Sequence, residues 1–200
     1  VVGDSAIAFF RELREAGISP DDIPVVTFAI AEDELRATDH TDMVGHYAAW
    51  NYFQSIDTDV NKKFVAAFKK RYGADRVTSD VIAAAYNSVY LWANAVRESG
   101  NTDVQQVRNA LRQQSLNAPE GIIAVDPATQ HTWRPVYIAK IQKTGQFDIV
   151  WNSNGSVRPV PYPITRSKSD WNAFVSDLYQ RWGGWANTAT TTPKEAATND

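Results

Sequence analysis

Residues 119–151 read PEGIIAVDPATQHTWRPVYIAKIQKTGQFDIVW and decide most about the fold of this chain. The β-branched run 122–125 stops at an Asp-Pro pair, and Pro127 favours a turn because proline fixes φ and has no N–H to donate. Alternating apolar residues in 136–141 and again in 147–151 are typical of two further strands, separated by a Thr-Gly turn. The stretch therefore predicts three short strands that end in a β ribbon.

The rest of the chain alternates helical patterns with apolar runs. Helices are expected wherever a capping residue precedes apolar residues at helical spacing and a glycine often follows. A continuous apolar run is typical of a strand that is buried on both faces of a parallel sheet. The expected helices begin at Asp4 or Ser5, near Glu32, at Thr58, at Ser79, at Asp103 and at Ser167 or Ser169, and the expected strands are residues 25–30 and 44–53. This order predicts an α/β fold with a mainly parallel sheet flanked by helices, plus the C-terminal β ribbon.

Composition excludes several classes of protein. The net charge is −3, and no basic face of the kind that binds nucleic acid stands out. The chain has no cysteine, so it has neither thiol catalysis nor disulfides, which suits an exported protein. The three histidines, His40, His46 and His131, lack metal-ligand spacing, and no nucleophile elbow or phosphate-binding loop is present. We therefore expect no catalytic residue, no metal and no cofactor.

Both ends of the chain carry expectations about its organisation. Val1-Val2 resembles the end of a strand that leads directly into a helix, so we expect a fragment whose N-terminal half lies outside it. Residues 1–186 are then the C-terminal portion of a ligand-binding domain. Residues 187–200 are rich in Thr and Ala without apolar periodicity, so we expect a disordered tail.

Two strand-to-helix junctions are the candidate binding site. In open α/β sheets, ligands bind beyond the carboxyl ends of the strands. The first junction contains Val2, Gly3, Asp4 and Ser5, where glycine permits close approach and the helix start offers free N–H groups. The second junction contains Ala29 and Glu32. An equally weighted alternative for Asp4 and Ser5 is that they only cap the helix.

Several motifs, in order, resemble solute-binding proteins for urea and short-chain amides. The residues that carry the resemblance are 119–151, GDSAIAFFRELREAGI at 3–18, AIAEDEL at 29–35, GHYAAWNYFQSIDT at 45–58, and Arg166, Trp171 and Phe174. The chain is also similar to the amide-sensing regulator built on the same scaffold. The resemblance implies a type I periplasmic-binding fold, in which two α/β lobes clamp a ligand, with this chain supplying mainly the second lobe and pieces of the first.

The resemblance also implies a function. It indicates non-catalytic binding of urea or a short amide for a bacterial ABC importer, outside the cytoplasm, with permease subunits as partners. Backbone N–H groups and Ser5 would serve the ligand carbonyl, and Asp4 or Glu32 would accept from its NH₂ groups. The amide sensor has a small hydroxylated residue or a glycine near the position of Asp4. This difference favours a urea-type ligand over a simple amide. A sensory domain of the same fold and a branched-chain amino-acid binder, with Glu32 facing the ammonium group, remain alternatives.

A further expectation concerns the helix that begins at Ser79. Without the opening sheet of the first lobe, this helix would expose the apolar side chains Tyr86, Tyr90 and Trp92. We expect a neighbouring chain, such as a second copy in a homo-oligomer, or a rearrangement to cover them.

Overall fold

The computed structural model describes residues 1–185, which fall into two compact units. The first unit is Val1–Pro159 and the second begins at Val160. The expected disordered tail, 187–200, lies outside the described residues. Among the helices of residues 1–185, none has the length and hydropathy that crossing a membrane requires.

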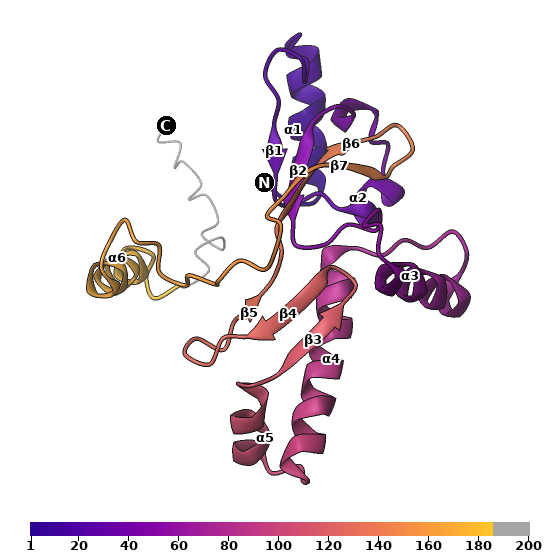
Figure 1. Ribbon diagram of the computed structural model, residues 1–200. Coiled ribbons are helices and arrows are strands. Elements are labelled where there is room, and N and C mark those ends of the chain that lie inside the picture. Colours follow the sequence, from indigo (N-terminus) through magenta and orange to yellow (C-terminus); the bar gives the residue numbers. More distant parts are fainter. Residues whose placement is uncertain (186–200) are drawn as a thin grey trace, which may run out of the picture. The chain divides into compact units, whose positions relative to one another are not determined.

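The first unit contains a four-stranded sheet with the order β1-β2-β6-β7 (Figure 1). The strands are β1 (Val26–Thr27), β2 (Tyr47–Trp50), β6 (Tyr137–Ile141) and β7 (Phe147–Asn152). Only the pair β1–β2 is parallel, while β2–β6 and β6–β7 are antiparallel. The expectation of a mainly parallel sheet is therefore wrong: a tight turn at Gly145 folds β7 back on β6, and β6 runs back along β2.

Two helices and a short 3-10 turn build the core of this sheet. The elements are α1 (Asp4–Glu15), α2 (Glu32–Ala37) and the turn Thr41–Met43. Phe10 of α1 and Leu35 of α2 are fully buried against Ala48 and Ala139 of the central strands. Small residues in the strands let the large side chains of the helices approach closely, so the sheet has one continuous apolar core on the side of these helices.

Strand β1 is shorter and more exposed than the apolar run 25–30 predicts. The strand lies at the edge of the sheet, and Val26 remains 47% exposed. The N–H of Val25 donates to Nδ1 of His46, and the N–H of Ala29 donates to the hydroxyl of Thr27. Side chains thus take up backbone donors on both sides of the strand, which limits regular pairing to two residues. A strand buried on both faces is wrong for this segment.

A second sheet, with the order β3-β4-β5, lies in the same unit. Its strands are β3 (Ser115–Ala118), β4 (Gly121–Val125) and β5 (Thr132–Trp133), all antiparallel. The expected three-strand ribbon over 119–151 is thus divided, because β4 belongs to this sheet and β6 and β7 to the first. Strand β3 was not expected, since its sequence SLNA has no β-branched residue.

Three helices accompany the second sheet: α3 (Asp59–Tyr72), α4 (Asp80–Ser99) and α5 (Val104–Leu111). Leu91 of α4 packs with Ala118, Ile123 and Val125 of β3 and β4. Helix α5 lies alongside α4, and Ala95 packs there against α5 (Figure 1). This end of the unit therefore has its own apolar core.

Helix boundaries follow the capping residues in most places. The side chain of Thr58 accepts from the N–H of Asn61, and that of Asp103 accepts from the N–H of Gln106. Ser79 also stands at the N-cap position of α4, although its hydroxyl does not form the cap hydrogen bond. The expectation that Asp4 or Ser5 caps α1 is wrong: Gly3 is the N-cap, with a positive φ of 59° that places both polar residues inside the first turn.

The second unit contains the helix α6 (Lys168–Arg181). Ser167 accepts from the N–H of Asp170, and the Asp170 carboxylate accepts from the N–H of Ser167, which is a complete capping box. The indole N–H of Trp171 donates to the carbonyl of Pro163 and fixes the preceding loop. Ser167 is thus confirmed as the start of the last expected helix.

Helix α4 carries the exposed aromatic residues that the sequence predicts. Tyr90 is 44% exposed and Trp92 53% exposed. Tyr86 is better protected, because its ring packs between Phe64 of α3 and Tyr90, with ring centres 4.6 Å from each. The exposure is confirmed for Tyr90 and Trp92, and Tyr86 is instead partly covered by α3.

Candidate functional site

A groove of about 290 Å³ lies where the two predicted junctions approach each other. Val1 and Val2 line one side, residues 25–29 line the other, and Phe9 and Phe10 of α1 contribute further apolar surface. The groove lies beside β1 and includes residues that follow its carboxyl end, the place where ligands bind in open α/β sheets. Its lining is mainly aliphatic and aromatic, so it suits the apolar part of a small ligand.

The first junction is open to solvent. Gly3, Asp4 and Ser5 are all exposed, and the positive φ of Gly3 turns the chain sharply into α1. The helical hydrogen bonds begin with the N–H of Ala6, which donates to the carbonyl of Gly3. The N–H groups of Asp4 and Ser5 come before that point and have no partner within the helix. Asp4 and Ser5 therefore stand at a helix start, next to Val2 of the groove, where carbonyl and amide groups of a ligand can be hydrogen-bonded.

The second junction places its acidic residue in the interior. Glu32 is the first residue of α2 and has no exposed surface. Its Oε1 accepts from the backbone N–H of Gln54 at 2.6 Å, whereas its Oε2 has no hydrogen-bond partner among the described residues. Burial, opposed by the hydrogen bond from Gln54, raises the pKa of the Glu32 carboxyl to about 8. The Glu32 carboxyl therefore holds its proton at neutral pH, and its second oxygen has no partner within residues 1–185.

The residues around Gln54 form a closed polar network. The Tyr52 hydroxyl donates to Oδ1 of Asn61 at 2.8 Å and lies 2.7 Å from the hydroxyl of Thr78. The Asn61 amide donates to the carbonyls of Gln54 and Ile56, and the Gln54 side chain accepts from the N–H of Thr78. Because nearly every polar group is satisfied, this network fixes the segment that follows β2, and with it the backbone donor that Glu32 uses.

Sequence reasoning missed a buried ionic cluster. Arg134 bridges the carboxylates of Asp80 and Glu120, all three nearly inaccessible to solvent. Arg134 follows β5, Asp80 begins α4, and Glu120 lies in the turn between β3 and β4. The only signal in the sequence is the position of these charges, an arginine and a glutamate between apolar strand segments, because their pairing depends on contacts 14 and 54 residues apart.

The structure thus brings together part of the predicted site. Val2 and Ala29 line the same groove. Gly3, Asp4 and Ser5 adjoin it along the chain, at the start of α1. Glu32 is not among the residues that line the groove, and its side chain is fully buried.

No group of three or more potential metal ligands occurs within residues 1–185. Comparison with protein families decides what kind of domain this is: residues 1–168 match the family described as "Periplasmic binding protein domain". The chain belongs to the periplasmic binding protein family. Its fold, two sheets with flanking helices and two chain connections between them, is the type I periplasmic-binding fold.

Solved structures of this fold resemble the periplasmic binding domain over most of its length. An ABC transporter solute-binding protein from Rhodopseudomonas palustris BisB5, in complex with 3,4-dihydroxybenzoic acid, has a TM-score of 0.64 and 23% identity. It aligns with 80% of this chain and 44% of its own length. A leucine-binding protein from Thermotoga maritima MSB8 has a TM-score of 0.58 and 19% identity, over 72% of this chain and 40% of its own.

One similar protein carries the name of an enzyme. The limonene hydroxylase of Geobacillus stearothermophilus is 38% identical over 117 residues, which are 58% of this chain and 21% of that protein. The periplasmic binding domain thus spans about a fifth of this relative and less than half of the solved structures above. The likeness to these structures establishes the fold.

Proposed function

We propose that this chain is part of a solute-binding protein of an ABC importer, which holds a small polar solute without transforming it. The observation that carries the proposal is the groove shared by Val2 and Ala29, in a domain of the periplasmic binding family. Solutes bind such a domain by closure of two lobes, so the groove would be one wall of the complete site. The protein would act outside the cytoplasm and deliver its ligand to permease subunits.

Urea or a short-chain amide is the proposed ligand class. A carbonyl oxygen would accept from the N–H groups of Asp4 and Ser5 and from the Ser5 hydroxyl. The NH₂ groups would donate to the carboxylate of Asp4, which adjoins the groove. The apolar lining at Val2 and Ala29 would contact the short alkyl group of an amide.

A branched-chain amino acid is the second candidate ligand, since the leucine-binding protein from Thermotoga maritima has the same fold. Its side chain would occupy the apolar groove, and its ammonium group would face Glu32. A carboxylate-binding group is also needed, and the helix start at Asp4 and Ser5 would have to supply it through backbone N–H groups. A sensory protein of the same fold would use the same contacts.

The exposed aromatic residues of α4 are proposed to be covered in the functional assembly. Tyr90 and Trp92 are large exposed side chains, and Tyr90 lines, together with Tyr72, a groove of about 510 Å³ between α3 and α4. Surfaces of this kind mark contacts with protein. A second copy of the chain in a homo-oligomer is the partner we propose. Analytical ultracentrifugation tests it: wild type should sediment as an oligomer, and Tyr90→Ala should sediment with a lower mass.

Calorimetric titration of the protein in its full-length natural form tests the ligand class. Urea, acetamide, formamide, leucine and benzoate are titrated in parallel. Tight binding of urea or an amide, with leucine silent, supports the proposal, and binding of leucine alone moves the protein to the amino-acid binders. Silence with all five solutes overturns the ligand class, and turnover of a bound solute overturns the non-catalytic role.

A further inference from the structure

Arg134 lies on the connection between the two sheets of the first unit. It follows directly after β5 and precedes β6, so the chain passes through it from the second sheet to the first. Its carbonyl accepts from the N–H of Val157 at 2.9 Å, which holds its backbone in place. Its side chain is directed into the protein and is only 15% exposed.

The guanidinium group joins two elements of the second sheet and its helix. Its Nη2 lies 2.9 Å from Oδ1 of Asp80, at the start of α4, and its Nε lies 2.9 Å from Oε1 of Glu120, in the β3–β4 turn. Asn87, two turns further along α4, donates to the same oxygen of Glu120 at 2.7 Å. The Tyr137 hydroxyl of β6 donates to the Glu120 carbonyl. One side chain thus connects α4, the turn and the connection between the sheets.

The other connection between the sheets is linked to the same segment. Asn51, at the end of β2, donates from its side chain to the carbonyl of Pro135 at 2.7 Å. The N–H of Val136 donates to the hydroxyl of Ser153, next to β7. The two connections are therefore hydrogen-bonded to each other directly beside Arg134.

The chemistry of the cluster indicates that it orients the elements it joins rather than adding to the stability of the fold. Two buried carboxylates share one guanidinium, and burial, opposed by Arg134, raises the pKa of Asp80. Buried ion pairs of this kind are often no more stabilising than apolar residues of the same volume. They fix the relative orientation of the groups they join, because the planar guanidinium of arginine hydrogen-bonds two acceptors at fixed angles, which the ammonium group of lysine cannot do.

We propose that Arg134 is a positioning residue that fixes the connection between the two sheets, and thereby the geometry in which the ligand groove is presented for lobe closure. The part that concerns ligand affinity rests on the proposed function. The part that concerns the connection itself does not, and it can be measured without any ligand.

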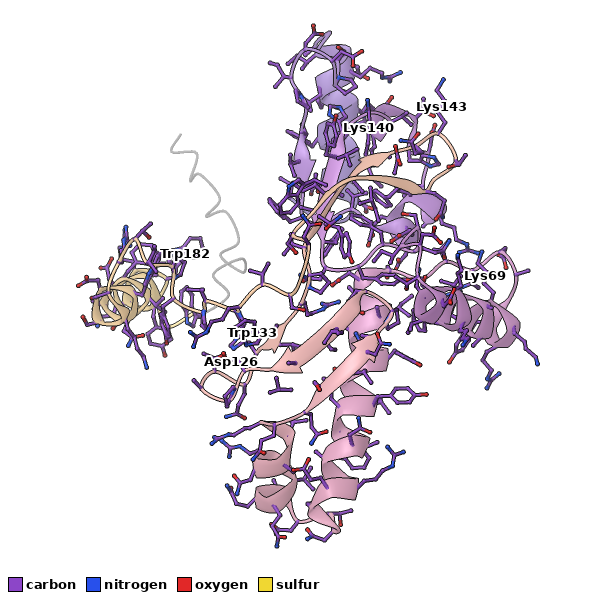
Figure 2. The ribbon with its side chains drawn as sticks, viewed as in Figure 1. Lys69, Asp126, Trp133, Lys140, Lys143 and Trp182 are labelled. Atoms are coloured by element: carbon purple, nitrogen blue, oxygen red, sulfur yellow. The ribbon has the colours of Figure 1, made fainter. Side chains whose placement is uncertain are left out.

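The test compares three variants with wild type. Arg134→Met leaves Asp80 and Glu120 buried without a partner, so it destabilises the fold as a whole. The triple variant Arg134→Met, Asp80→Asn, Glu120→Gln removes all three charges together and recovers the unfolding temperature. The control is Arg158→Met, which removes an exposed arginine paired with Asp126, the residue labelled beside Trp133 in Figure 2.

Hydrogen exchange at Val136 and Ser153 is the first measurement. In the triple variant these amides exchange about tenfold faster, which equals about 1.4 kcal/mol of local opening, while amides of the first sheet such as Ile141 are unchanged. Ligand binding weakens by about tenfold although the unfolding temperature has recovered, a factor typical of linked sites. Arg158→Met changes neither quantity.

Each outcome decides the matter. If exchange at Val136 and Ser153 is unchanged in the triple variant, the proposal is overturned. If the triple variant binds ligand as tightly as wild type, Arg134 does not influence the ligand groove. If wild type binds none of the tested solutes, the proposed function fails, and the exchange measurement alone decides the role of Arg134.

Discussion

The carboxylate of Glu32 accepts a hydrogen bond from the backbone N–H of Gln54 at 2.6 Å, and this contact joins the first turn of α2 to the segment that follows β2. The two residues are 22 positions apart, and the carboxylate is fully buried. A carboxylate charge in this place has lost the stabilisation that water gives it, and the hydrogen bond from one N–H group replaces only part of that stabilisation. The pKa of about 8 follows from that imbalance.

Glu32 makes the stability of the domain depend on pH. Its pKa in the folded state, about 8, is above its ordinary value of 4.5, so the folded state holds the proton more tightly than the unfolded state. The stability that it contributes is fully present below pH 4.5 and is lost as the pH rises through 8. Thermal unfolding at pH 5 and pH 9 should show this loss in wild type, whereas Glu32→Gln, which keeps the shape of the protonated acid, should lose less.

The control for this prediction is Glu12→Gln, which changes an exposed glutamate of α1 paired only with the neighbouring Arg11. Its dependence on pH should match that of wild type. An identical loss of stability between pH 5 and pH 9 in wild type and Glu32→Gln would contradict the assignment to Glu32.

The hydroxyl of Tyr52 should be worth about 1–3 kcal/mol of folding free energy, the range for a buried hydrogen-bonding group whose partners are left unsatisfied. Tyr52→Phe removes the donor to Asn61 and the contact with Thr78, both inside the protein, without changing the volume of the ring. Urea unfolding measures the difference. Tyr72→Phe is the matched control, because Tyr72 is 61% exposed and should change stability by less than about 0.5 kcal/mol.

The helices of this domain could be predicted from sequence because their limits are set locally. Thr58 and Asp103 cap the helices that follow them, and Gly73 and Gly100 end α3 and α4, all through contacts within a few residues. At α1 the same reasoning chose the wrong cap. Gly3 adopts a positive φ, which glycine does without strain, and it serves as the N-cap. The helix therefore begins at Asp4, one residue earlier than it would if Asp4 were the cap.

The sheets and the site could be predicted only in part because they depend on contacts between distant residues. Alternation in 136–141 and 147–151 identified β6 and β7, but it could not indicate that β2 pairs antiparallel with β6. Val2 and Ala29 were expected near a ligand from strand ends alone, and they line one groove. The bridge from Arg134 to Asp80 has no local pattern, since nothing in the sequence near either residue indicates the other.

Gly45 should not tolerate a side chain. Its φ is +94°, and a Cβ atom there would lie 2.8 Å from Cγ of Pro20, closer than real contacts allow. Gly45→Ala should therefore cost more than the about 1–2 kcal/mol of left-handed backbone strain alone. Gly17→Ala isolates that strain, because Gly17 has φ +76° and no atom within 4 Å of its Cβ position. Equal unfolding temperatures for the two variants would show that Pro20 moves aside without cost.

Phe28 should contribute to ligand binding and little to folding. Its side chain is 72% exposed, yet it lines the groove beside Ala29, so its apolar surface would be buried only when a ligand or the opposing lobe covers it. Burying a phenylalanine is worth about 1.5–3 kcal/mol, so Phe28→Ala should weaken binding by about tenfold or more. Its unfolding temperature should stay close to wild type, since the surface it removes is already in water. Val104→Ala, at an equally exposed position on α5, should leave both quantities unchanged. A variant at Phe28 that binds as tightly as wild type would show that the ligand does not contact this groove.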